Sequence, residues 1–179
     1  AYIDAVKQTV SGALFTATAT ATVANGTTEL TLLGSGIGTK TLPANFLVAG
    51  KTIRAHVKGY WSSAAVPGNL TIRLKLGTVV LATTGAIAPI GSVSNLYFEM
   101  DGYFTCWTTG AGGTVLAEAR VLKQDDATTR NAQIWGAVNT ATVAVDTTAA
   151  QALDVTAEWS TVNASNSISG AVAAIEVLN

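Results

Sequence analysis

The sequence is short of the residues that most often carry chemistry. It contains one cysteine, Cys106, and one histidine, His56, among 179 residues. A single cysteine cannot form an internal disulfide, and stable zinc sites use three or four histidine or cysteine ligands. We therefore expect no metal or other cofactor. Cys106 lies in an alternating apolar run and is expected to be a buried, inert thiol, while His56 is expected to be an exposed polar residue of a strand.

Charged residues are scarce too, at 12% of the chain with a net charge of −1. This is about half the usual charged fraction, so much of the surface must be threonine, serine, alanine and glycine, which suits a protein that stays assembled. The lysines and arginines are spread along the chain and form no basic stripe. We therefore expect no nucleic-acid partner.

Long apolar runs are absent as well. No stretch approaches the roughly 18 consecutive apolar residues that a membrane helix requires, and the N-terminus has no basic segment leading into an apolar one. We therefore expect no membrane partner, and a soluble protein in which Ala1 follows a removed initiator methionine. A chain of 179 residues fits one domain with a sizeable core.

What the sequence has in abundance is alternation of apolar and polar residues, the pattern of half-buried strands. Residues 51–61 alternate strictly, with Trp61 on the inward face and Arg54 and Lys58 on the outward face. Residues 70–76 alternate in the same way. Further strands are expected at residues 27–33, 79–82, 95–108, 114–123, 132–138, 152–160 and 167–178.

About eight principal strands with long connections predict an all-β fold, a two-sheet antiparallel β-sandwich of jelly-roll type. The repeating threonine and alanine residues at 16–22 suggest that residues 1–23 are an extended N-terminal arm outside the sandwich, which then spans residues 24–179. Arms of this kind often pair with another subunit. If residues 27–33 form the first jelly-roll strand, strand 51–61 pairs with strand 152–160. Arg54 and Lys58 then face Asp154 and Glu158.

The alternation changes phase within the last strand. Ile168 and Val172 share one face, but Ile175 and Val177 share the other. The slip near residues 173–174 predicts either a β-bulge or a strand that is buried on both sides. A strand buried on both sides would need an assembly partner over its outer face.

Few residues suggest catalysis. Asp125 and Asp126 form an acid pair in an expected loop, but calcium needs six to eight oxygen ligands, so we interpret them as solvated. Glu99 and Asp101 share a face two residues apart, a spacing that distantly resembles the carboxylate pair of a glycosidase. Same-face acids on a charge-balanced sheet are more often structural. We therefore expect no catalytic residues and no enzymatic activity, with a hydrolase as a remaining alternative.

The aromatic residues are more informative. Tyr97, Tyr103 and Trp107 fall on the outward phase of residues 95–108, whereas Trp61 and Trp159 fall on inward phases and are expected in the core. An exposed aromatic face serves either sugar stacking or a protein interface. The candidate interaction surface consists of Tyr97, Tyr103, Trp107, Arg54 and Lys58.

Three segments resemble structural proteins of tailed phages and prophages: residues 42–54 (LPANFLVAGKTIR), 70–77 (LTIRLKLG) and 143–156 (VAVDTTAAQALDVT). The resemblance extends over roughly residues 42–179 and rests on framework strands and turns. It implies a virion component, with a capsid decoration, or cement, protein ahead of a tail or fibre part. It carries over no binding residue.

From these observations we expect a homotrimer at the capsid surface that stabilises the head by binding the major capsid protein across subunit joints. The alternative is a receptor- or carbohydrate-binding module of a phage tail or fibre. A groove holding Tyr97, Tyr103 and Trp107 would favour that alternative. Burial of the same residues between subunits would favour assembly.

Overall fold

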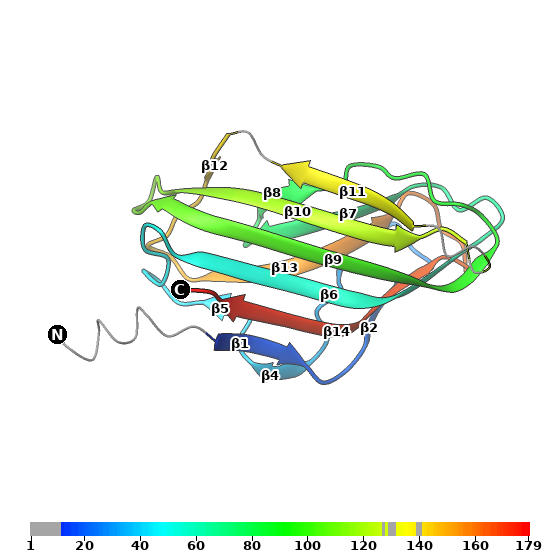
Figure 1. The fold of residues 1–179 in the computed structure, drawn as a ribbon, viewed down its shortest axis with the longest axis horizontal. Helices are drawn as coiled ribbons and strands as arrows, with labels where there is room; N and C mark the ends of the chain where they lie inside the picture. Colours follow the sequence, from blue (N-terminus) through cyan, green and yellow to red (C-terminus); the bar gives the residue numbers. More distant parts are fainter. Residues whose placement is uncertain (1–11, 127, 129–131, 139–140) are drawn as a thin grey trace.

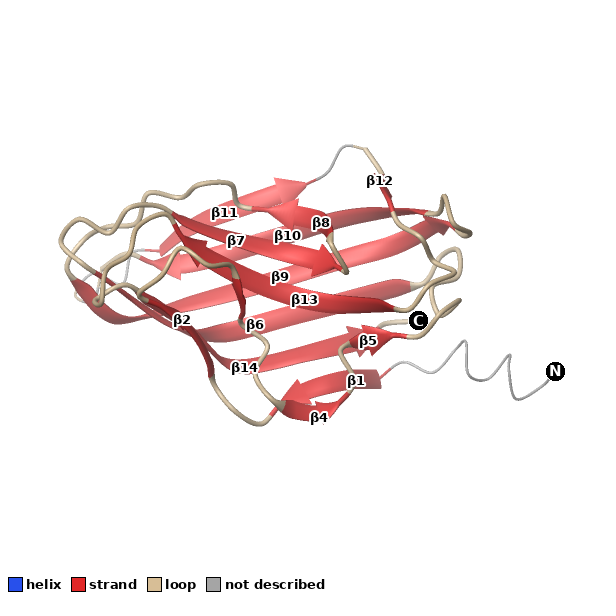
Figure 2. Cartoon of the chain, turned by 180° about the vertical axis from the view of Figure 1, so that it is seen from behind, coloured by secondary structure: helices blue, strands red, loops and turns tan. Residues whose placement is uncertain are grey.

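A computed structural model describes residues 12–126, 128, 132–138 and 141–179. These residues form two antiparallel sheets packed face to face, with strands and loops but no helix among them. Figures 1 and 2 show the two layers from opposite sides. The predicted all-β sandwich is confirmed. Within the described part of the chain there is accordingly no helix long and apolar enough to span a membrane.

The large sheet faces the viewer in Figure 1 and contains nine strands. Its main path runs β11 (Ala132–Val138), β10 (Thr114–Gln124), β9 (Val93–Thr108), β6 (Thr52–Ser63), β14 (Ser167–Val177), β1 (Gly12–Ala17) and β4 (Gly36–Gly38). Off this path, β12 (Val143–Ala144) pairs with β10 and β2 (Ala21–Ala24) pairs with β14.

The small sheet faces the viewer in Figure 2 and contains five strands. Its path runs β3 (Leu30–Thr31), β13 (Gln151–Trp159), β7 (Leu70–Leu76) and β8 (Val79–Thr83), and β5 (Thr41–Leu42) pairs with β13.

The strand order is that of a jelly roll. If the eight framework strands β1, β3, β6, β7, β8, β9, β13 and β14 are lettered B to I, the sheets contain B-I-D-G and C-H-E-F. The predicted pairing of residues 51–61 with 152–160 is wrong. Strand β6 pairs with β9 and β14, and β13 pairs with β7. The prediction missed β1 as the first strand, which displaced residues 51–61 from D to C.

The N-terminal boundary also differs from the prediction. Residues 12–24 belong to the sandwich, because β1 and β2 both pair with β14, and Phe15 and Val23 are buried in the core. The described part of the expected arm therefore pairs with its own chain. The stretch of alternating small and β-branched residues fits closely beside the last strand. Residues 1–11 lie outside the described part.

The phase change in β14 is a β-bulge, which was one of the two predicted alternatives. The register shifts between Gly170 and Val172, two residues before the expected place. Gly59 of β6 lies opposite Gly170, and a Cβ at Gly59 would lie 1.8 Å from the Ser169 carbonyl oxygen. Only glycine allows the backbones to approach this closely. The bulge returns the residues after it to the inward phase that buries Ile175 and Val177.

The core confirms the predicted faces of the long strands. Trp61 and Trp159 are fully buried, and Cys106 is a buried free thiol. Among the described residues, the charged side chains of Lys51 and Lys123 are buried as well. Lys123 of β10 is buried, its ammonium 4.2 Å from the centroid of the Trp61 ring and paired with Asp125. The predicted solvated state of Asp125 is thus wrong, because this carboxylate neutralises a buried ammonium.

Candidate functional site

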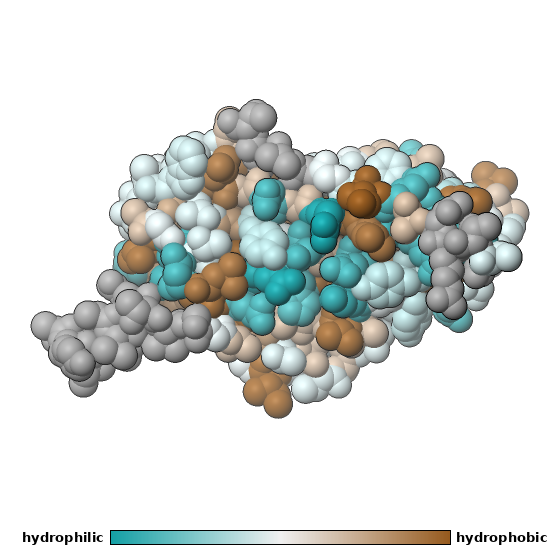
Figure 3. Space-filling view, in the orientation of Figure 1, coloured by the Kyte–Doolittle hydropathy of each residue, from teal (hydrophilic) through white to brown (hydrophobic). Residues whose placement is uncertain are grey.

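The five residues of the predicted interaction surface all lie on the outer face of the large sheet. Arg54 and Lys58 stand on β6, and Tyr97, Tyr103 and Trp107 stand on the adjacent strand β9. Arg54 lies directly opposite Tyr103, and Lys58 lies opposite Glu99. Figure 3 shows hydrophilic side chains gathered over the middle of this face, with hydrophobic ones beside them. We call this surface the large-sheet face.

A bidentate ion pair occupies the centre of the large-sheet face. Arg54 Nε donates to Asp101 Oδ1 at 2.7 Å, and Nη2 donates to Oδ2 at 3.1 Å. The Tyr103 hydroxyl donates to the same Oδ2 at 3.0 Å. Burial raises the pKa of Asp101, but the hydrogen bonds from Arg54 and Tyr103 outweigh burial and hold this pKa below its ordinary value. The pair is therefore charged at neutral pH.

Two further contacts extend this network across neighbouring strands. Arg54 Nη1 donates to Glu176 Oε2 of β14 at 3.4 Å, and Lys58 Nζ lies 3.6 Å from Glu99 Oε2. The partners of Arg54 and Lys58 are thus Asp101, Glu176 and Glu99, and the predicted partners Asp154 and Glu158 lie on the other sheet. Opposite charges do meet across strands, as the sequence suggests, but on different neighbours.

His56 is more buried than expected, with 17% of its side chain exposed. It stands on a central strand between Arg54 and Lys58, so long side chains and two flanking strands cover it. Its Nδ1 lies 3.9 Å from Glu176 Oε2 and has no hydrogen-bond partner among the described residues. Burial lowers the pKa of His56, and the nearby Arg54 charge lowers it further. The imidazole is therefore neutral at pH 7.

Exposed apolar and aromatic side chains surround the ion pairs. Trp107 is 55% exposed, Val172 is 58% exposed and Ile134 is 64% exposed, and all three lie on the large-sheet face. Tyr60 and Tyr97 stand directly opposite each other and are also exposed. The Tyr97 hydroxyl donates to Glu99 at 2.7 Å, and burial together with this bond raises the pKa of Tyr97 to about 12.

The acid pair Glu99 and Asp101 does not have the electrostatics of a glycosidase site. Both carboxylates are held by cations, and the pKa of Asp101 is lowered, whereas a general acid needs a raised pKa. In the described residues, no group of three or more histidine, cysteine or acidic side chains is placed to hold a metal ion. This acid pair therefore supplies no carboxyl group with the raised pKa that a glycosidase acid needs.

Three residues that the sequence did not single out also shape this face. Glu118 and Arg120 of β10 and Ile134 of β11 line a hollow beside Tyr103. A signal for them existed, because Glu118 and Arg120 lie on the outward phase of residues 114–123 and strand β11 was expected. The hollow itself depends on which strands are neighbours, and the alternation of apolar and polar residues in the sequence does not reveal strand pairing.

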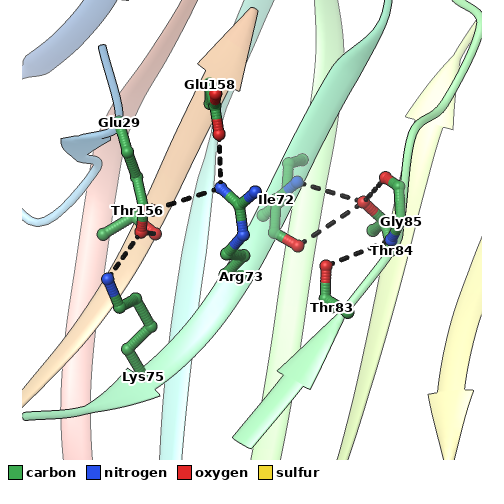
Figure 4. A network of polar contacts seen from close by, with 9 residues as sticks. All are labelled: Glu29, Ile72, Arg73, Lys75, Thr83, Thr84, Gly85, Thr156 and Glu158. Carbon is green, nitrogen blue, oxygen red and sulfur yellow. Dashed lines mark hydrogen bonds and ion pairs between the residues drawn. The ribbon is translucent and has the colours of Figure 1, made fainter. Parts of the chain in front are cut away.

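The outer face of the small sheet, which we call the small-sheet face, carries a second network (Figure 4). Glu29, just before β3, accepts hydrogen bonds from Thr156 at 2.6 Å and Lys75 at 2.9 Å, and lies 3.3 Å from Arg73. Arg73 also donates to Glu158 at 2.8 Å. Thr156 is only 5% exposed. Glu29 thus covers the polar centre of this sheet.

Comparison with protein-family models, with curated proteins and with solved structures finds no match to this chain.

Proposed function

We propose that the protein is a non-enzymatic structural component of a tailed-phage virion, a capsid decoration protein that binds across capsid subunits through its large-sheet face. The observation that carries this proposal is the arrangement of that face, in which exposed Tyr60, Tyr97, Trp107 and Val172 surround charges that are already paired. The phage assignment itself rests on the resemblance of residues 42–179 to virion proteins.

Paired charges make this face less costly to bury. A partner that covers an unpaired charge must replace its hydration, whereas Arg54 keeps Asp101 and Glu176 as partners when water leaves. The surrounding aromatic side chains contribute the apolar contact area that anchors most interfaces. A net charge of −1 adds little repulsion between copies. These properties favour lasting protein contacts.

The proposed assembly is a homotrimer seated on the major capsid protein at the capsid surface. The rigid two-sheet framework serves this role because it presents a broad, preformed face without folding on binding. The three sequence segments that resemble virion proteins overlap β5, β6, β7, β12 and β13, of which β6, β7 and β13 are framework strands. These segments support a fold shared with virion proteins. The binding role of the large-sheet face is proposed in addition to that resemblance.

The test compares one substitution on each sheet. Val172→Asp places a charge on the large-sheet face, and Val80→Asp places the same charge on β8 of the small sheet, where Val80 is also exposed. Both variants should fold, because exposed substitutions usually change stability by about 0.5 kcal/mol or less. Light scattering then gives the mass of each variant, and co-sedimentation with shells of the phage's major capsid protein gives binding.

We expect V172D to lose trimerisation or shell binding and V80D to keep both. A wild-type protein that remains monomeric and does not sediment with shells would overturn the proposal. Deleting residues 1–23 is not a usable test of assembly. It removes β1 and most of β2, and with them the core side chains of Phe15 and Val23.

A further inference from the structure

Two adjoining hollows form a groove across β9, β10 and β11 on the large-sheet face. The first has a volume of about 410 Å³ and the second about 210 Å³. Tyr103 and Glu118 stand opposite each other and line both hollows, so the two hollows adjoin at these side chains. The first falls in the size range of small-molecule sites. We call the pair the outer groove, and its outward-facing side chains are Asp101, Tyr103, Trp107, Leu116, Glu118, Arg120 and Ile134.

Part of the first hollow lies where a side chain is missing. Gly136 of β11 lies opposite Arg120, and a Cβ added there would meet no atom within 4 Å. A side chain at this position would therefore begin in open space and project into the hollow. The open space is thus a direct result of glycine at this position, and it can be filled by substitution.

Two polar side chains in the groove, Glu118 and Arg120, are available to form hydrogen bonds with a ligand. Across the centre of the face, Arg54, Lys58 and their acidic partners are paired. By contrast, the side chains of Glu118 and Arg120 make no hydrogen bond or ion pair within the described part of the chain. They stand two residues apart on the same face of β10, and one accepts hydrogen bonds while the other donates. A ligand in the groove would meet both.

Apolar surfaces lie next to these polar groups. Tyr103 lies where the two hollows join, Trp107 lines the second hollow, and Ile134 lines the first. Trp107 and Ile134 are each more than half exposed. A ligand whose hydroxyls both donate and accept, and which has an apolar face for an aromatic ring, would match these groups.

We propose that the outer groove binds a neutral saccharide. One carboxylate and one guanidinium cancel in charge, and Asp101 is already paired with Arg54, so the groove as a whole favours a neutral ligand. A pyranose ring presents hydroxyls at its rim and C–H groups on its faces, which matches Glu118, Arg120 and Trp107. Trp107 belongs to both surfaces, but the inference does not depend on the capsid role, since the rest of the groove lies on the β10 and β11 side of the face. Val172 lies on β14, on the other side of β6.

The experiment uses the full chain and a defined panel of glucose, galactose, mannose and N-acetylglucosamine with their trisaccharides. Binding is followed by tryptophan fluorescence and by calorimetry up to about 20 mM, since a ligand of about a dozen non-hydrogen atoms on an open site binds near millimolar. Gly136→Val fills the groove, and Trp107→Ala and Glu118→Gln each remove one contact. Tyr97→Ala is the matched control, an exposed aromatic of the same strand outside both hollows.

We expect at least one panel member to bind saturably, with affinity lost in G136V and reduced about tenfold in W107A and E118Q. Y97A should bind within twofold of wild type. Absence of binding across the panel would overturn the proposal, and so would binding that G136V leaves unchanged. A change in oligomer mass in G136V, without saccharide binding by the wild type, would assign the groove to a second copy of the chain instead.

Discussion

The small-sheet face and the large-sheet face both carry ion-pair networks, but the two networks are finished differently. On the small-sheet face, the chain supplies its own cover, because Glu29 arrives from a preceding loop and satisfies Thr156, Lys75 and Arg73. On the large-sheet face, the network of Arg54 is ringed by exposed aromatic and aliphatic side chains. The first network completes the fold of one chain. The second leaves a surface on which a partner can be placed.

Breaking the large-sheet network should have the largest effect on stability. Arg54→Ala removes the fork that holds Asp101, whose side chain is only 11% exposed, and leaves this carboxylate without its main partner. We expect a loss of about 2–3 kcal/mol in the free energy of unfolding, measured by urea denaturation. Arg54→Lys keeps the charge without the fork and should lose less. A change in R54A below about 0.5 kcal/mol would contradict this account of the network.

Breaking the small-sheet network should cost somewhat less. Glu29→Ala removes the acceptor for Thr156 and Lys75, and we expect a loss of about 2 kcal/mol. We expect the loop that carries Glu29 to shift and admit water in this variant, which reduces the loss in the free energy of unfolding. Glu29→Gln, which keeps an acceptor oxygen, is the control. Because this face is not the proposed interface, E29A should leave oligomer mass and shell binding unchanged, and a loss of either would remove the contrast between the faces.

Lowering the pH should also distinguish the two faces, and we expect its effect on stability to be the smallest of the three. The pKa of His56 is lowered from its ordinary value of 6.5, so the unfolded chain takes up this proton first and stability falls as pH drops below 6.5. Burial raises the pKa of Glu29, but hydrogen bonds from Thr156 and Lys75 with the charge of Arg73 lower it from 4.5. The stability that ionised Glu29 contributes on the small-sheet face is therefore lost only below pH 4.5.

His56→Gln should abolish the first decline and leave the second, as followed by thermal melts across pH 7 to 4. One group changes the slope by at most about 1.4 kcal/mol per pH unit. The imidazole lies among Arg54, Lys58, Asp101 and Glu176, and all of these remain in the variant. An unchanged decline between pH 6.5 and 5 in H56Q would show that another group causes it.

The faces of the long strands could be predicted because the pleat is a local property. Alternation alone placed Trp61 and Trp159 inside and Tyr97 and Trp107 outside, as observed. Pairing could not be predicted in the same way. It depends on counting every strand, and β1 was missed because it leads directly into the threonine and alanine repeat at 16–22, which resembles a low-complexity arm.

The outer groove illustrates a second limit. Glu118, Arg120 and Gly136 look ordinary in the sequence, and they form a site only because β10 and β11 pair in the register that sets Gly136 against Arg120. A shift of one residue would fill the hollow with a side chain. The five residues of the predicted interaction surface share one face because they belong to strands whose phase was clear.

The central place of β14 has a consequence for how the protein is made. This strand pairs with β1, β2 and β6, so the two ends of the large sheet join only through residues 167–177. During synthesis, β1 and β6 must wait for more than a hundred further residues to leave the ribosome before they are connected. Contacts so distant in sequence form slowly, and exposed strand edges invite wrong pairing meanwhile. Production of the protein should therefore be sensitive to growth temperature and to chaperone supply.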